Sequence, residues 1–244
     1  MLDQALLLEK TSRVLTGTYD FQKLAQQACD LIYKELKHDG FVGSGLFRVR
    51  PETNELYAYA YTAPSRRLID ALLPIQFSKL HLSMNADDNL TIRTARTGQS
   101  YESARFADFS RHALPDIVVD KIQKILKLKK CVSFPIFAKS GKVAGVLLCD
   151  FSDESAVARH VPLIQTFAKQ LGLSFSNIFA FERLMNSYRK EKGANEATKD
   201  EANIPSVKFT LRLTPNQIKK LESLSRDRHK TKAEVIRDVI DKTA

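Results

Sequence analysis

The 244-residue sequence lacks any apolar run long enough to cross a bilayer, which takes about 20 consecutive apolar residues. It also lacks, at its amino terminus, the basic-then-apolar pattern of a secretory signal. We therefore expect a cytoplasmic protein with no membrane partner. Apolar residues make up 43% of the chain and charged residues 27%, a composition that excludes a fibrous or wholly disordered protein.

Cysteine is scarce. Cys29, Cys131 and Cys149 are odd in number, widely separated and set among apolar neighbours. This arrangement is typical of buried, reduced thiols and argues against a disulfide framework. The lysines at 129 and 130 would lower the pKa of an exposed Cys131 thiol, but a cysteine within an apolar strand is more often a packing residue.

The usual signatures of catalysis and metal binding are missing. The sequence has no phosphate loop, nucleophile elbow or dinucleotide fingerprint. The acidic pair Asp87 and Asp88 falls in a predicted turn, where solvated carboxylates are ordinary. We therefore expect no enzyme activity, no cofactor and no metal. None of the five histidines has the spacing of metal ligands: His38, His81, His112, His160 and His229.

Positive charge is unevenly distributed. The net charge is +10. Residues 1–190 carry 26 basic and 19 acidic side chains, a net charge of +7. Residues 191–203 carry 2 basic and 4 acidic side chains (−2), and residues 204–244 carry 10 basic and 5 acidic side chains (+5). The last segment is the densest in positive charge, as a phosphate-binding module requires.

The most regular stretch near the carboxy terminus is a predicted strand. Residues 207–213 alternate strictly, with Lys208, Thr210 and Arg212 on one side and apolar residues on the other. A lone strand needs a partner. We expect an antiparallel copy from a second chain, which would place both sets of polar side chains on one face of a two-stranded ribbon.

Two predicted helices follow this strand. Thr214 followed by Pro215 favours a helix start, and the apolar spacing continues to about residue 229. Residues 231–234, Thr-Lys-Ala-Glu, have the spacing of a capping box and predict a second helix. So small a unit buries too little surface to be stable as a monomer.

Over residues 207–242 this pattern resembles the ribbon-helix-helix family of dimeric DNA-binding proteins. The resemblance implies base reading by Lys208, Thr210 and Arg212, since such a ribbon fits the DNA major groove. It implies phosphate contact by Thr231 and Lys232 at the start of the second helix. The chain departs from the family where His-Lys at 229–230 replaces the usual glycine. The alternative is a helical hairpin that only dimerises.

The preceding residues predict alternating helices and hairpins. A cap at Asp20 begins the second helix, and Tyr57, Tyr59 and Tyr61 are expected on one face of a strand. The apolar face of the last helix is wider than one sheet face could cover, which favours pairing with a second chain. The expected elements are helices at 2–16, 20–38, 66–73, 90–96, 116–128 and 157–189, strands at 43–50, 56–61, 75–82, 131–138 and 143–151, and a loop at 100–115.

Over residues 2–184 this order resembles the GAF family of small-molecule sensors. The most specific part is 131–151, with Pro-Ile at 135–136 and Gly-Val-Leu at 145–147. The expected fold class is therefore α+β: a GAF-like antiparallel sheet flanked by helices, a linker, then a small β-α-α ribbon-helix-helix module. The expected boundaries are 1–190 for the sensor and dimerisation domain, 191–204 for a coil linker and 205–244 for the DNA-binding module.

The GAF resemblance also suggests where a ligand would bind. The family's cyclic-nucleotide motif is absent, and no cysteine lies between Cys29 and Cys131 to attach a tetrapyrrole or reduce methionine sulfoxide. The family pocket corresponds to residues 89–115, where a cluster of side chains could hold an anionic or aromatic compound. An ordinary solvated loop is the alternative. The candidate ligand-binding residues are Arg93, Tyr101, Arg105, Phe109 and Arg111.

The sequence thus predicts a homodimeric, non-enzymatic, sequence-specific DNA-binding transcriptional regulator, modulated by a small molecule at the GAF domain. Its expected partners are double-stranded DNA, a second copy of the chain and a small-molecule effector. One alternative is a non-catalytic accessory DNA-binding protein of a plasmid, toxin–antitoxin or conjugation system. A second alternative is an enzyme in the GAF pocket.

Overall fold

The computed structural model describes residues 18–73 and 76–197, together with Lys10, Leu15, Glu222, Ser223, Arg226 and Thr231. The chain forms two compact units, Met1–Lys192 and Gly193–Ala244. Of the expected helix at 2–16, only Lys10 and Leu15 are described, and both are helical. No helix among the described residues is long and apolar enough to span a membrane.

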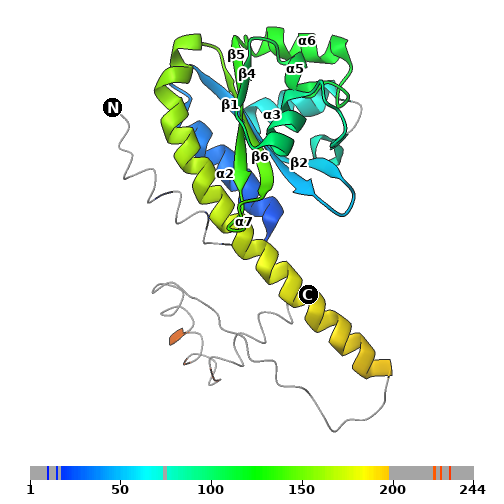
Figure 1. The fold of residues 1–244 in the computed structure, drawn as a ribbon. Coiled ribbons are helices and arrows are strands. Elements are labelled where there is room, and N and C mark those ends of the chain that lie inside the picture. The colour runs from blue at the N-terminus through cyan, green and yellow to red at the C-terminus, as the bar shows by residue number, and fades with distance from the viewer. Residues whose placement is uncertain are drawn as a thin grey trace. The chain divides into compact units, whose positions relative to one another are not determined.

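A six-stranded sheet forms the centre of the first unit (Figure 1). All neighbouring strands are antiparallel, in the order β3-β2-β1-β6-β5-β4. The two long hairpins, β1–β2 and β5–β6, meet in the middle where β1 pairs with β6. The strands are β1 (Phe41–Arg50), β2 (Glu55–Tyr61), β3 (His81–Ser83), β4 (Tyr101–Ser103), β5 (Lys130–Phe137) and β6 (Val143–Phe151).

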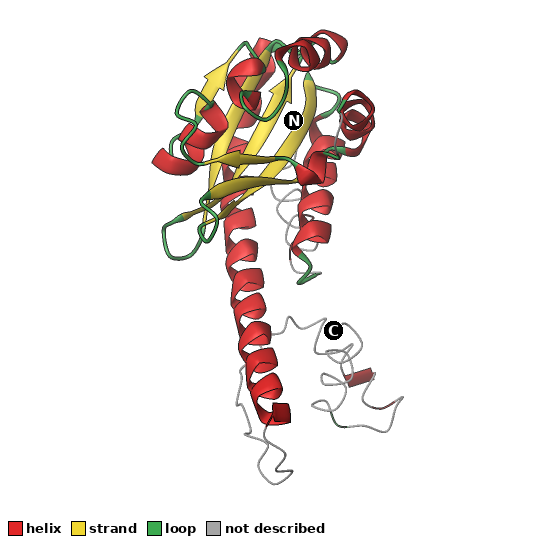
Figure 2. Ribbon diagram, turned by 90° about the vertical axis from the view of Figure 1, so that its right-hand side faces the viewer, coloured by secondary structure: helices red, strands yellow, loops and turns green. Residues whose placement is uncertain are grey.

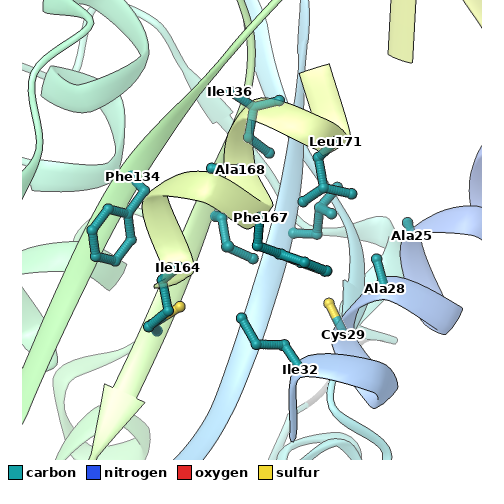
Figure 3. Packing of buried hydrophobic residues seen from close by; sticks show 14 of the residues in the cluster. Ala25, Ala28, Cys29, Ile32, Phe134, Ile136, Ile164, Phe167, Ala168 and Leu171 are labelled. Atoms are coloured by element: carbon teal, nitrogen blue, oxygen red, sulfur yellow. The ribbon is translucent and has the colours of Figure 1, made fainter. Parts of the chain in front are cut away.

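Two long helices, α2 (Phe21–Leu36) and α7 (Glu154–Ala197), pack on one face of the sheet. The expected cap is confirmed, because the Asp20 carboxylate accepts a hydrogen bond from the backbone N–H of Lys23 at 3.0 Å. Figure 3 shows apolar side chains of α2, α7 and β5 meeting in this core. The labelled residues are Ala25, Ala28, Cys29 and Ile32 from α2, Ile164, Phe167, Ala168 and Leu171 from α7, and Phe134 and Ile136 from β5.

Short helices cover the opposite face of the sheet (Figure 2). Their apolar residues pack against the strands around Leu56, Val146 and Leu148, which are all buried. The covering elements are α3 (Ala63–Leu72), the 3-10 turn η1 (Phe77–Lys79), α4 (Leu90–Thr97), α5 (Ala107–Ser110) and α6 (Asp116–Ile125). The described part of the chain therefore has two apolar layers, one on each side of the sheet, and the α+β prediction for this region is confirmed.

The longer predicted elements are confirmed, and several shorter ones are wrong. The predicted loop at 100–115 contains β4 and α5, and the predicted strand at 75–82 is replaced by η1 and the three-residue β3. Elements of one turn or three residues are too short to produce a period in the sequence.

The end of α7 differs from the predicted coil linker. The helix continues to Ala197, through the first residues of the segment 191–204. That segment is rich in Glu, Lys and Ala, which are strong helix formers, and the single glycine at 193 costs only about 1 kcal/mol. The expected domain boundaries themselves stay a prediction.

The prediction that three tyrosines of β2 share one face is wrong. Tyr59 packs toward α2 and α7, whereas Tyr61 belongs to the core on the opposite face. The reason is an extra, unpaired residue in β2, Tyr59: Leu46 of β1 pairs with Ala60, but the next residue of β1, Phe47, pairs with Ala58. The extra residue reverses the alternation between Tyr59 and Tyr61.

Candidate functional site

A small cavity lies between the sheet and the short helices of the second face. Its volume is about 30 Å³, enough to hold a water molecule, which needs about 10–15 Å³ on the same measure. Aromatic and aliphatic side chains make up most of its wall. The lining residues are Phe47, Leu56, Ala58, Tyr61, Ile69, Phe77, Leu80, His81, Leu82, Phe106, Phe109, Ser110, Ala113, Leu114, Ile122 and Leu148.

Tyr61 connects this cavity to a buried carboxylate. Its ring lies across β1 above Gly43 and Gly45. A Cβ added at Gly45 would lie 2.9 Å from the ring, and one added at Gly43 would lie 3.3 Å away. The glycines thus leave the space that the ring occupies, as expected where another group approaches the strand closely. The Tyr61 hydroxyl then donates a hydrogen bond to Oδ2 of Asp150.

Asp150 lies within β6, opposite Gly43 of β1 and Cys131 of β5. It is fully buried, and alternation along β6 places it on the same face as the cavity-lining Leu148. Among the described residues, Oδ1 of Asp150 has no hydrogen-bond partner within bonding distance and angle.

Burial raises the pKa of the Asp150 carboxyl. Desolvation raises the pKa of Asp150 to about 6, and hydrogen bonds from the Tyr61 hydroxyl and the Cys131 thiol oppose the rise. The thiol is a weak donor, and its contact with Asp150 falls outside hydrogen-bond geometry, so among the described residues only the Tyr61 hydroxyl makes a regular hydrogen bond to this carboxylate. Burial and the neighbouring Asp150 charge also raise the pKa of the Tyr61 hydroxyl well above its usual value. Tyr61 therefore remains a donor throughout the physiological range.

The cysteines are all buried and reduced, as predicted. Burial raises the pKa of Cys29 to about 12 and moves the pKa of Cys131 and Cys149 well above the usual range. The lysines beside Cys131 therefore do not produce a thiolate. Within the described ranges, no group of three or more His, Cys, Asp or Glu side chains is placed to hold a metal ion.

The structure separates the five predicted ligand-binding residues. Only Phe109, on α5, lines the cavity. The guanidinium of Arg93 lies 4.7 Å from the ring centroid of Tyr101, away from the cavity lining. Arg105 is exposed, and Arg111 forms ion pairs with Asp88 at 3.6 Å and Asp108 at 3.4 Å. Their role in ligand binding stays a prediction.

Helix geometry explains why Arg93 points outward. The buried residues of α4 include Ile92 and Ala95, and Arg93 lies on the exposed side of the same turn. The helix begins after Asn89, whose side chain accepts hydrogen bonds from the backbone N–H groups of Thr91 and Ile92. The side chains that the segment 89–115 contributes to the cavity lining are mainly apolar: Phe106, Phe109, Ser110, Ala113 and Leu114.

The residues predicted to bind DNA cannot be placed in the same way. Lys208, Thr210, Arg212 and Lys232 lie outside the described residues. Thr231 is described and exposed. The ribbon-helix-helix resemblance stays a prediction from the sequence.

Two signals in the sequence could have revealed the buried site. Asp150 is the only charged residue in the nine-residue apolar strand β6. A charge at such a position needs a partner or a function. The Gly-Ser-Gly stretch at 43–45 is the second signal, because glycine within a strand often marks a place where another group of the protein or a ligand lies close to the strand backbone.

The arrangement of a six-stranded antiparallel sheet, two long helices on one face and a cavity under short helices on the other defines a GAF fold. Solved structures with this fold match 70–75% of the chain. The GAF domain of A. aeolicus nlh2 in an inactive state is 17% identical, has a TM-score of 0.51, and the match covers 70% of this chain and 94% of that one.

Two further solved structures give the same result. The GAF domain of a phosphoenolpyruvate-protein phosphotransferase from Coxiella burnetii is 13% identical over 75% of this chain and 96% of that one, with a TM-score of 0.52. A phycoerythrobilin-bound GAF domain of a cyanobacterial phytochrome is 12% identical, with a TM-score of 0.51, and the match covers 75% of this chain and 99% of that one. The predicted GAF fold is thus confirmed. The sequence matches no family profile and no curated protein.

Proposed function

We propose that the chain is a homodimeric, sequence-specific DNA-binding transcriptional regulator whose GAF domain binds a small molecule. The observation that supports the proposal is a long helix that leaves the GAF fold and runs in the chain direction of the basic segment. α7 begins at Glu154, directly after the strand that holds Asp150, and runs for 44 residues to Ala197. The basic segment with the ribbon-helix-helix pattern follows it in the sequence.

Ligand sensing is supported by the site under the short helices. The cavity has apolar walls with few polar groups, among them the Tyr61 hydroxyl, which donates to the buried carboxylate of Asp150; mostly apolar walls with a few fixed polar groups are typical of small-molecule sites. We propose that the domain binds its ligand without transforming it. The raised pKa of Cys131 and Cys149 supports this, because neither thiol is a ready nucleophile.

Dimerisation is supported by apolar side chains left exposed on α7. Leu173, Leu184 and Tyr188 are 45%, 38% and 48% exposed. Steps of eleven and four residues return to nearly the same side of a helix, so these three form one stripe. Pairing of this stripe with its copy in a second chain would remove it from water. Sedimentation equilibrium of the full chain and of residues 1–190 should give dimers in both cases.

DNA binding is tested by selecting duplexes from a random pool with the full chain. We expect one sequence to be enriched. On that duplex, Arg212→Ala should lower affinity by about 10- to 100-fold per lost base contact and have much less effect on random DNA. Lys232→Ala should weaken binding to both and make the salt dependence shallower by about one unit per phosphate contact.

Different results would overturn different parts of the proposal. If no sequence is enriched, or Arg212→Ala weakens all duplexes equally, the ribbon reads no bases and the accessory-protein alternative is favoured. A monomeric 1–190 fragment at micromolar concentration would contradict dimerisation through the GAF domain. Regulation by a ligand requires that the ligand change operator affinity, by a coupling free energy of about 1–3 kcal/mol.

A further inference from the structure

We propose that a groove beside α7, separate from the cavity, binds a small organic molecule that carries a phosphate group. The groove has a volume of about 670 Å³ and lies between α7 and the turns at 51–54 and 138–142, which join β1 to β2 and β5 to β6. It shares no lining residue with the cavity beside Tyr61. The site therefore goes beyond the sensing function proposed above and does not depend on it.

Close packing between α7 and the end of β5 holds two walls of the groove together. The backbone N–H of Lys139 donates a hydrogen bond to Oγ of Ser176, on α7, at 2.9 Å. One helical turn earlier, a Cβ added at Gly172 would overlap the carbonyl oxygen of Phe137, so the two backbones approach as closely as glycine permits. The groove is thus formed before a ligand binds, and its volume lies within the range of about 300–1,000 Å³ typical of small-molecule sites.

The groove has an excess of positive charge. Its lining includes four cationic and two anionic side chains, a net charge of +2. Glu182 accepts two hydrogen bonds from Arg48, at 2.8 and 3.2 Å, so these two charges neutralise each other. Among the described residues, none of the other three cations forms an ion pair with a carboxylate. Lys139, Lys142 and Arg183 therefore keep their positive charges available for a ligand.

The free donors of these side chains suit a phosphate group. The ammonium group of Lys139 has three donors and gives one hydrogen bond, to Oδ1 of Asn177 at 3.0 Å. The guanidinium of Arg183 has five N–H groups, of which Nε–H donates to the carbonyl oxygen of Phe179 at 3.2 Å. Lysine and arginine form charge-assisted hydrogen bonds with phosphate oxygens. A phosphate, with more charge and more acceptor atoms than a single carboxylate, matches three cations best.

The apolar part of the lining favours an organic ligand over bare phosphate or DNA. Contact with these side chains removes apolar surface of a ligand from water, which is favourable. A DNA backbone would use the cations and leave this apolar surface uncovered. The apolar stripe of α7 proposed for dimerisation lines no part of the groove, so the two sites use different residues. The apolar lining residues include Val49, Val143, Ala144, Phe179 and Ala180.

The experiment compares three probes: adenosine triphosphate, which carries both parts, adenosine, which lacks the phosphates, and tripolyphosphate, which lacks the organic part. The full chain is labelled with ¹³C at its alanine methyl groups. The signals of Ala138 and Ala180, which line the groove, are assigned as those lost in Ala138→Ser and Ala180→Ser. They report binding at the groove and not at the basic segment 204–244. We expect adenosine triphosphate to shift both signals and to bind about 10-fold more tightly than either other probe.

Matched variants test the role of the cations. Lys139→Gln combined with Lys142→Gln should lower the affinity for adenosine triphosphate by about 10- to 100-fold. Lys121→Gln combined with Lys124→Gln, on the exposed side of α6, removes the same charge and should leave the affinity unchanged. Glu52→Gln removes the second carboxylate of the groove and should raise the affinity by about 2- to 5-fold. All five side chains are exposed, so the variants should fold, and circular dichroism checks this.

Several outcomes would overturn the proposal. One is an equal loss of affinity in the groove variant and the α6 variant, which would indicate attraction by net charge alone. Another is binding of adenosine or tripolyphosphate as tightly as adenosine triphosphate, since one of the two parts would then contribute nothing. A third is that adenosine triphosphate shifts neither groove signal, and a fourth is that random duplex DNA shifts both at lower concentration, which would assign the groove to a DNA backbone. The probe titrations contain no operator, so failure of the regulatory proposal leaves their results unchanged.

Discussion

Asp150 should give the first unit a stability that decreases as pH rises through the acidic range. The pKa of its carboxyl is about 6 in the folded chain against a reference value of 3.8. Between these values the folded state binds more protons than the unfolded state. The favourable contribution of the protonated group is therefore fully present below about pH 4 and is lost as pH rises through 6.

The magnitude follows from the size of the shift. Each pKa unit corresponds to about 1.4 kcal/mol, so the shift from 3.8 to about 6 is worth about 3 kcal/mol in total. About 2 kcal/mol of this loss should fall between pH 4.5 and 7.5. Asp150 is fully buried, so solvent screening does not reduce the effect.

Urea unfolding of the full chain at several pH values would measure how the contribution of Asp150 to stability depends on pH. The chain contains no tryptophan, so far-UV circular dichroism and tyrosine fluorescence are the suitable signals. The quantity to compare is the free energy of unfolding of Asp150→Asn minus that of wild type. It should rise by about 2 kcal/mol from pH 4.5 to 7.5. Other titrating groups cancel in this difference, and exposed Asp120→Asn serves as the control.

Tyr61→Phe tests the cause of the shift. The Tyr61 hydroxyl lowers the pKa of Asp150 by donating to the ionised form. Its removal should move the transition in the free energy of unfolding to higher pH. The reasoning would be refuted if the difference between wild type and Asp150→Asn were constant with pH, since Asp150 would then have the same pKa in both states.

Three further substitutions test close packing. Gly172→Ala would place a Cβ 1.9 Å from the carbonyl oxygen of Phe137, so it should lower the free energy of unfolding by about 3 kcal/mol in urea titrations. Gly45→Ala, with its Cβ 2.9 Å from the Tyr61 ring, should cost about 1–3 kcal/mol and broaden the near-UV dichroism of the tyrosines. Arg48→Lys should lower the melting temperature, because it loses the bidentate pair with α7 and the contact of its guanidinium with aromatic rings.

The sequence predicted the long elements well because their apolar periods repeat. The stripe of α7 that includes Ile164, Phe167 and Leu171 is buried as expected, and the hairpin at 131–151 forms with its turn in place. The second face of the sheet was harder, since η1, β3, β4 and α5 are each at most four residues long. Their positions depend on contacts with the sheet, which no local pattern encodes.

The five candidate ligand-binding residues do not gather around the cavity, for a different reason. The prediction relied on charged and aromatic side chains near one another in the sequence, which included Arg93 and Arg105. In the fold, the cavity-lining residue Tyr61 donates a hydrogen bond to the buried carboxylate of Asp150, which lies 89 positions later in the chain. Contacts of this separation arise from strand order and register, and here from the extra residue in β2, Tyr59, that turns Tyr61 to the cavity side.

The position of Asp150 also joins the site to both long helices. Two residues after Asp150, the backbone N–H of Ser152 donates to the carbonyl oxygen of Gly40 at 2.9 Å, which ties the end of β6 to the turn after α2. At the start of α7, Arg159 and His160 both contact Asp39 in the same turn, at 2.7 and 3.0 Å. These polar contacts are partly exposed and individually weak. Together with the Ser152 hydrogen bond they make the end of β6, the turn after α2 and the start of α7 one connected unit. A shift of β6 that follows a change of charge at Asp150 would therefore move the start of α7 with it.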